Sequence, residues 1–177
     1  MVKVEVEGVV LNLTTYAPVV ILRNKKGEVL PIVIGIFEAQ AILLALEETE
    51  LSRPLTHDLV LEVLQKFDGT IVRLEIHSLR ENVYLADVVL DIRGEEHKLD
   101  CRPSDGIALA LRSGAPIFAG EDLLEAPDII KYYEGKRFLR SNDMDKPIGK
   151  NETEEFRKVM ENLSTKEFWK RLQEEDE

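Results

Sequence analysis

Two stretches of alternating apolar and polar residues, 71–79 and 83–92, constrain the fold of this chain more than any other feature. In each stretch every second side chain is apolar over several residues, which is the pattern of a strand with one buried face. Aligning the two apolar faces predicts an antiparallel hairpin that pairs Leu74 with Val88 across a three-residue loop, with Asn82 in the left-handed region. A slip by one residue would turn the apolar face to solvent, so the pattern predicts the register as well as the pairing.

A third strand, which ends at Asp100, follows a turn around Gly94. A four-residue turn at this point places Val89 opposite Asp100. Arg73, Val89 and Asp100 then form one row across the sheet, and Arg73 is expected to neutralise Asp100.

The rest of the first 135 residues contains further strand and helix patterns. Strands are expected at residues 2–13, 18–24, 29–34 and 117–118. Helices are expected at residues 36–49, from a Thr56 cap to Gly69, at 104–113 and near 121–134. The apolar face of the helix that begins at Thr56 is formed by Leu59, Val60, Val63, Leu64 and Phe67.

The remaining residues divide into two segments of different character. Residues 136–151 are largely polar and contain Gly, Asn, Asp and Pro, which predicts a linker after a domain of residues 1–135. Residues 152–177 carry apolar positions at helical spacing, which predicts an amphipathic helical tail. A tail this short cannot bury its own apolar stripe, so we expect it to dock on the domain or on another subunit.

Composition and charge restrict the classes of function. The 177 residues carry a formal net charge of −11. Binding of nucleic acid by bulk electrostatic attraction needs a basic face, so the negative charge disfavours this class of protein. It does not disfavour a metal-dependent nuclease, because the active site of such an enzyme is itself acidic. Cys101 is the single cysteine, expected to be a buried thiol, which excludes an intramolecular disulfide and a multi-cysteine zinc site. The chain has no run of about 18 apolar residues and no signal-peptide pattern, which predicts a cytoplasmic protein without membrane contact.

Polar residues crowd the turn between the strand that ends at Asp100 and the helix that follows it. Arg102 can bind a carboxylate or a phosphate, Asp100 and Asp105 can hold a metal ion, and backbone N–H groups at the helix start can bind an anion. The same residues also suit an ordinary helix, with Ser104 as N-cap, Asp105 complementing the helix dipole and Gly114 ending the helix. The local pattern leaves both interpretations open.

A second group of polar residues, Arg53 to Asp58, opens the helix that begins at Thr56. The helix dipole disfavours an imidazolium in the first turn, so His57 is expected to be neutral near pH 7 and able to act as a general base or a metal ligand. The alternative is that Thr56 and Asp58 cap the helix and that His57 is a surface residue.

Two other polar residues have a less specific pattern. His77 lies on the polar face of its predicted strand, where most histidines are partly exposed and inert. Glu38, in the first turn of a predicted helix, either complements the helix dipole or belongs to a site. The sequence contains no Walker loop, dinucleotide fingerprint, His-Glu-x-x-His motif or nucleophile elbow, and no pattern in it arranges a Ser-His-Asp triad.

Four groups of residues along the chain carry a resemblance to a known family. They are Pro31–Gly35 with Glu38–Ile42, Ser52–Leu59, Ile76–Leu79, and Arg102–Ala110 leading to Ser113–Ile117. Together they resemble the bifunctional nuclease domain family over about residues 1–135. The resemblance implies an α+β domain with a mixed or largely antiparallel sheet packed with helices, an activity that degrades RNA and DNA, and usually an oligomer. The polar positions shared with the family fall on Glu38, Arg53, His57, Asp58, His77, Ser78, Arg102, Ser104 and Asp105.

The leading hypothesis is a nuclease that hydrolyses phosphodiester bonds of RNA and DNA with the help of Mg²⁺ or Mn²⁺. The expected catalytic residues are His57, as the base that activates water, with Asp58 and Asp105. The expected phosphate-binding residues are Arg53, Arg102 and Ser104, and the expected metal ligands are Asp58, Asp100 and Asp105.

Two alternatives use the same sequence features differently. The first is a non-catalytic oligomeric regulator or scaffold that recruits a partner through its helical tail, in keeping with the negative charge and the absence of a basic stripe. The second is a module that binds a small anionic ligand beside Arg102. The expected partners are therefore RNA or DNA as substrate and further copies of this chain, with a dimer as the commonest homo-oligomer.

Overall fold

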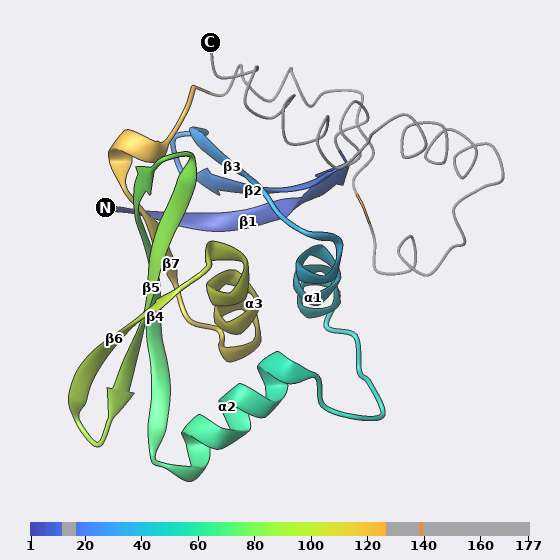
Figure 1. Cartoon of the computed structure of the whole chain (residues 1–177), viewed down its shortest axis with the longest axis vertical. Coiled ribbons are helices and arrows are strands. Elements are labelled where there is room, and N and C mark those ends of the chain that lie inside the picture. The colour runs from blue at the N-terminus through green and yellow to red at the C-terminus, as the bar shows by residue number, and fades with distance from the viewer. Residues whose placement is uncertain (12–16, 127–138, 140–177) are drawn as a thin grey trace, which may run out of the picture. The chain divides into compact units, whose positions relative to one another are not determined.

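A computed structural model of the chain describes residues 1–11, 17–126 and 139. In this part the chain forms an α+β domain around one mixed sheet of seven strands in the order β3-β2-β1-β7-β4-β5-β6 (Figure 1). The strands are β1 (Val2–Leu11), β2 (Pro18–Asn24), β3 (Val29–Val33), β4 (Gly69–Arg80), β5 (Val83–Ile92), β6 (Glu95–Cys101) and β7 (Ile117–Ala119). The helices are α1 (Ile36–Leu46), α2 (Thr56–Lys66) and α3 (Pro103–Ser113), with a short 3-10 turn η1 (Glu121–Leu123). The expected fold class is confirmed.

The short strand β7 joins the two halves of the sheet. It pairs antiparallel with β1 and parallel with β4, whereas the other neighbouring strands pair antiparallel. A sheet with one parallel pairing needs a long crossover connection, and the chain from β4 to β7 supplies it through β5, β6 and α3.

The predicted hairpin is present, and its core register is confirmed. Leu74 pairs with Val88, as the alternation indicates. The loop is shorter than expected, because β4 and β5 are joined by only Glu81 and Asn82, both with positive φ (48° and 60°). His77 is an extra residue in β4, since the ladder passes from Ile76 directly to Ser78, and this β-bulge restores the register that a three-residue loop would have produced.

The predicted register of β6 is wrong by two residues. The turn consists of Arg93 and Gly94 alone, with φ of 56° and 87°, the left-handed conformations of a tight two-residue hairpin turn. Val89 therefore pairs with Lys98, and Asp100 lies opposite Asp87. Because the turn is two residues shorter than expected, Asp100 moves out of the row that contains Arg73.

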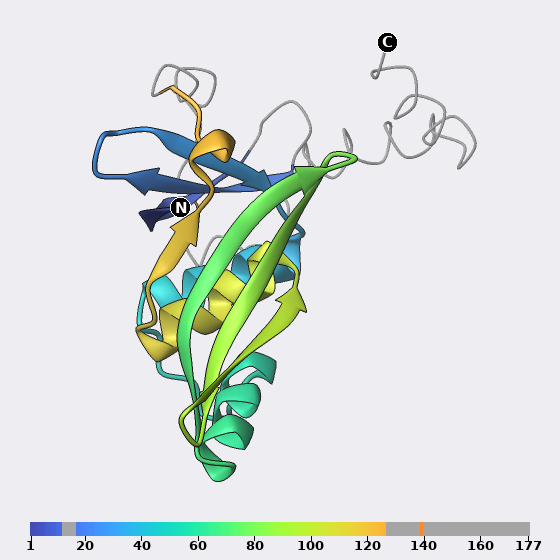
Figure 2. The ribbon, with the colours of Figure 1, turned by 90° about the vertical axis from the view of Figure 1, so that its left-hand side faces the viewer.

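All three helices lie on one side of the β4–β5–β6 part of the sheet (Figure 2). Buried side chains of α1 and α3, such as Ile42 and Ile107, share a core with Leu74 and Ile76 of β4. α3 comes very close to the sheet at Gly106, where a Cβ atom would overlap Leu74 and stand 3.1 Å from the Cys101 sulfur. A residue without a side chain is therefore needed at this point of the helix.

α2 is the exception among the helices, because none of its residues is buried. Of its predicted apolar face, the side chains of Leu59, Val60, Val63 and Phe67 are between 40% and 63% exposed. The pattern predicted the helix, but most of its apolar face is open to solvent in the described part of the chain.

Several predicted boundaries differ from the structure. α3 begins at Pro103 with Arg102 at the N-cap position, so Ser104 is not the cap, whereas Gly114 ends the helix as expected with φ of 72°. After η1 the chain forms an isolated bridge between Glu125 and Val29, so the helix expected from residue 121 does not begin there.

The predicted tail of residues 152–177 lies outside the described residues, as does the predicted linker apart from Leu139, whose N–H donates to the carbonyl oxygen of Val9 (2.8 Å). In the described part of the chain, no helix combines the length and the apolar character that a membrane span requires.

Candidate functional site

Charged side chains meet where the three helices begin. Glu38 lies in the first turn of α1, His57 in the first turn of α2, Asp105 in the first turn of α3, and Arg102 at the N-cap position of α3. We refer to Glu38, His57, Arg102 and Asp105 as the helix-start cluster. Each helix start presents unpaired backbone N–H groups and a partial positive charge, which favours anions at this place.

Arg102 holds the cluster together. Its Nε and Nη2 donate to the two carboxylate oxygens of Asp105 (2.6 and 3.0 Å), and its Nη1 donates to Glu38 Oε1 (2.8 Å). These hydrogen bonds, first of all those to Asp105, raise the pKa of Arg102 above its ordinary value. The side chain is nevertheless 65% exposed. A guanidinium has five N–H donors, so two remain available for a phosphate or carboxylate from solution.

Asp105 also faces the imidazole of His57. His57 Nε2 lies 3.5 Å from Asp105 Oδ1, and the histidine side chain is only 17% exposed. Partial burial opposes the ionisation of Asp105, but Arg102 and His57 outweigh this effect and lower the pKa of the carboxyl group. Asp105 is therefore a carboxylate near neutral pH, placed to orient the imidazole ring.

Asp58 points away from this cluster and is engaged in holding two helices together. Its Oδ2 accepts the N–H of Leu55 (2.7 Å), which satisfies a backbone group at the start of α2. Its Oδ1 accepts the Nε of Arg112 near the end of α3 (2.9 Å). The capping interpretation thus describes the contacts of Asp58, but the Thr56 cap is wrong, because Thr56 is the first residue of α2 and Leu55 is its N-cap residue. Arg112 is a further partner of Asp58.

Arg53 lies in a separate cavity of about 560 Å³ beside α1 and α3. Asp58 and Arg112 also line this cavity, and its apolar walls include Leu44 and Leu111. Among the described residues Arg53 is an exposed cation without an ion-pair partner. It is therefore not part of the helix-start cluster.

The structure separates two other expected site residues from the cluster. Ser104 is 7% exposed and belongs to the interior side of α3. Asp100 is exposed on the edge strand β6, opposite Asp87. The aspartates expected to bind a metal ion thus lie with different partners, and in the ranges that the structure describes, no three His, Cys, Asp or Glu side chains are placed so as to hold one. These three aspartates do not fit a single-ion site.

Glu38 is the member of the cluster that the sequence left undecided. Its carboxylate folds back over the start of α1, and a Cβ atom at position 35 would overlap it. The combination of Gly35 with a carboxylate in the first helical turn is the local signal for this arrangement. The contact of Glu38 with Arg102, 64 residues away, is a tertiary feature.

The chain is a small α+β domain in which the starts of three helices bring together one guanidinium, one imidazole and two carboxylates. Residues 20–131 match the family model of the bifunctional nuclease domain. The chain is 31% identical over 167 residues to an uncharacterized protein of Mycobacterium tuberculosis strain H37Rv. The aligned residues cover 94% of this chain and 97% of that protein. This chain belongs to the bifunctional nuclease domain family.

Two plant proteins are more distant relatives. "Bifunctional nuclease 2" of Arabidopsis thaliana is 25% identical over 142 residues, and "Bifunctional nuclease 1" of the same plant is 26% identical over 143 residues. These matches cover 76% and 77% of this chain but only 41% and 42% of the plant proteins. The plant proteins therefore contain more than the domain that they share with this chain.

Proposed function

We propose that this protein is a nuclease that hydrolyses phosphodiester bonds of RNA and DNA at the helix-start cluster. The observation that carries the proposal is the contact of His57 and Arg102 with the same carboxylate, Asp105. A general base, the acid that orients it and a phosphate-binding cation are thereby within one hydrogen-bonded group. Membership of the bifunctional nuclease domain family supports the same reaction.

In the proposed reaction each residue has a separate role. Asp105 holds the Nε2 side of His57, so that Nδ1 takes a proton from the attacking water. The two remaining donors of Arg102 hold the phosphate and stabilise the charge that develops on it. The water oxygen forms a bond to phosphorus, the bond to the leaving sugar oxygen breaks, and the proton on His57 passes to that oxygen.

Metal dependence is a separate part of the proposal. Mg²⁺ or Mn²⁺ would supply charge stabilisation at the phosphate and a more acidic bound water. Because Asp58, Asp100 and Asp105 are not placed so as to bind one metal ion together, the steps of the proposed reaction use only the side chains of the helix-start cluster. The cleavage assay therefore includes Mg²⁺, Mn²⁺ and EDTA as separate conditions.

The test measures cleavage of end-labelled single-stranded RNA and DNA by the full chain. We expect turnover by the wild type and a loss of about 10²–10⁴-fold for His57→Ala, which is the usual contribution of a general base. Arg102→Ala and Asp105→Asn are expected to be similarly impaired. The matched controls are His97→Ala and Arg93→Ala, since these side chains are 48% and 72% exposed on β6 and in the preceding turn.

Two results would reject parts of this proposal. Absence of cleavage by the folded wild type under all three metal conditions would reject the enzyme. Unchanged cleavage in His57→Ala and Asp105→Asn would reject the helix-start cluster as its site. Circular dichroism of each variant distinguishes a loss of catalysis from a loss of fold.

A second candidate function, the oligomeric scaffold, is favoured by the exposed face of α2. Leu59, Val60 and Val63 of α2 and Phe67 at its C-cap are exposed at helical spacing, and association with a partner would remove them from water. We propose that copies of this chain associate through this face. Light scattering should give a smaller particle for Val63→Glu than for the wild type, with Glu62→Lys as a control for charge on the same helix. An unchanged mass would reject this interface.

The proposed recruitment through the tail is tested by deleting residues 150–177. A scaffold that recruits its partner through the tail loses this binding on the deletion, whereas a nuclease that acts at the helix-start cluster keeps its activity. The two functions therefore predict different outcomes for the same shortened chain.

A further inference from the structure

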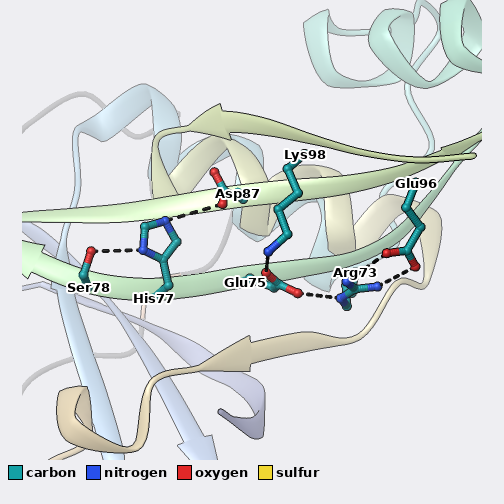
Figure 3. A network of polar contacts seen from close by, with 7 residues as sticks. All are labelled: Arg73, Glu75, His77, Ser78, Asp87, Glu96 and Lys98. Carbon is teal, nitrogen blue, oxygen red and sulfur yellow. Dashed lines mark hydrogen bonds and ion pairs between the residues drawn. The ribbon is translucent and has the colours of Figure 1, made fainter.

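A second group of reactive side chains lies on the sheet, on the face turned away from the helices (Figure 3). Ser78 Oγ is 3.0 Å from His77 Nδ1, and His77 Nε2 is 3.6 Å from Asp87 Oδ2. Hydroxyl, imidazole and carboxylate thus stand in a chain across β4 and β5. The helix-start cluster, by contrast, belongs to the helices that pack on the other face.

The β-bulge in β4 explains why two consecutive residues can contact each other. Successive side chains of a regular strand point to opposite faces of the sheet. Here the ladder pairs Ile76 with Ala86 and Ser78 with Leu85, so that His77 has no partner on β5. Bulges re-aim side chains in this way and occur frequently beside active sites. The bulge therefore puts a nucleophile and a base within hydrogen-bond reach of each other.

The neighbouring cations donate their hydrogen bonds to carboxylates other than Asp87. Glu75, only 12% exposed, accepts hydrogen bonds from Arg73 and from Lys98, and the guanidinium of Arg73 also binds Glu96 (Figure 3). Arg73 and Lys98 thus donate hydrogen bonds to Glu75 and Glu96, and the charge of Lys98 is also attracted by Asp87. Asp87, 22% exposed, is the acid that faces His77.

The hydrogen-bonding capacity of these groups determines which ring nitrogen of His77 carries the proton. A carboxylate only accepts hydrogen bonds, so the tautomer that suits the contact with Asp87 carries its proton on Nε2. In this tautomer Nδ1 has a free lone pair that can accept the O–H of Ser78. This is the order of acid, base and nucleophile in a serine triad, with the two ring nitrogens exchanged.

We propose that Ser78 is the nucleophile of a second reactive site, which accepts acyl groups from small activated esters. Ser78 Oγ forms a bond to the carbonyl carbon of the ester while its proton passes to His77 Nδ1. The bond between that carbon and the alcohol oxygen breaks, and the alcohol leaves with this proton. Water then attacks the acyl-serine, His77 takes the proton of the water, and the carboxylic acid is released as Ser78 recovers its hydrogen.

The degree of exposure sets the class of substrate. The His77 side chain is 36% exposed, so a small molecule in solution can reach the pair of reactive groups. Because these groups lie on the surface of a sheet, we expect small acyl groups with good leaving groups, such as phenyl esters, and little selectivity for the shape of the acyl chain.

The experiment combines a covalent probe with a rate measurement on the full chain. A fluorophosphonate reacts with an activated serine by displacement of fluoride, and mass spectrometry of the labelled wild type should place the phosphonate on Ser78. Release of p-nitrophenol from p-nitrophenyl acetate should fall to the background rate in Ser78→Ala. In His77→Gln, acylation should slow by about 10²-fold or more, as for loss of a general base.

The controls separate this site from general surface reactivity. Ser113→Ala removes a hydroxyl that donates to the carbonyl oxygen of Leu109 (2.9 Å), and His97→Ala removes another exposed imidazole. Both variants should keep the wild-type rate. A label on another residue, or an unchanged rate in Ser78→Ala, would overturn the proposal. The labelling result uses the wild type and therefore does not depend on the folding of a variant.

Discussion

Substitution of Gly106 tests how closely α3, which carries Arg102 and Asp105, must approach the sheet. A Cβ atom at this position would overlap Leu74, a side chain with 0% exposure, and would stand 3.1 Å from the sulfur of Cys101. Overpacking of a core by one carbon costs about 1–3 kcal/mol. Alanine inside a helix gains about 1 kcal/mol over glycine. Because Leu74 is fully buried, we expect an overpacking cost in the upper part of this range, about 2–3 kcal/mol, and therefore a net loss of about 1–2 kcal/mol of unfolding free energy in Gly106→Ala.

Urea denaturation measures this difference. With a slope of roughly 2 kcal/mol per molar urea, the midpoint of Gly106→Ala should fall by roughly 0.5–1 M. Leu74→Val removes the two methyl carbons nearest to the new Cβ, so the double variant should be more stable than the sum of the two single losses indicates. An alanine variant as stable as the wild type, or more stable by the helix-propensity gain, would refute the close packing of α3 on β4.

Three further predictions concern single side chains. The pKa of Asp105 is lowered in the folded chain, so its charge stabilises the native state at neutral pH, and this contribution disappears as the pH falls through the lowered pKa. Denaturation of wild type and Asp105→Asn should therefore differ more at neutral pH than at about pH 3, and a constant difference would contradict the assignment. Burial raises the pKa of the Cys101 thiol to about 11, so iodoacetamide should react with it far more slowly at neutral pH than with free cysteine. Cys101 is partly buried in the structure, not fully buried as expected, and an equal rate would show that this partial burial does not protect the thiol. Arg112, whose side chain is 10% exposed, binds Asp58, so Arg112→Met should lower the unfolding free energy by about 1–3 kcal/mol, and Asp58→Asn should recover part of this loss in the double variant.

The candidate site could be predicted from sequence as a set of residue types but not as a set of contacts. The sequence placed His57 and Asp105 in the first turns of two helices, and the structure confirms both positions. Asp58 lies in the same helical turn as His57, but its carboxylate binds Arg112 and not the helix-start cluster. Consecutive residues of a helix point about 100° apart, so the direction in which α2 crosses α3 decides which of the two reaches Asp105.

The outer face of the sheet shows a different limit of the sequence pattern. Alternation placed His77 on the polar face of its strand, but it could not reveal the bulge that brings Ser78 to its side. The bulge depends on the conformation of the turn at Glu81 and Asn82, which is one residue shorter than the apolar pattern indicates. The conformation of turn residues with positive φ depends both on the turn itself and on the strands that flank it. A difference of one residue in the length of the turn changes which side chains of the two strands lie next to each other.

By itself the sequence determined the features that depend on near neighbours along the chain. These include the buried face of the β4–β5 hairpin, the pairing of Leu74 with Val88, and the end of α3 at Gly114. Each follows from the two-residue period of a strand or from hydrogen bonds within one helical turn. Only the tertiary structure decided that Arg102 would bridge Glu38 and Asp105, since two of these residues are 64 positions apart. Such contacts depend on how the helices lie on the sheet, and the packing at Gly106 that sets this position uses atoms from three separate elements.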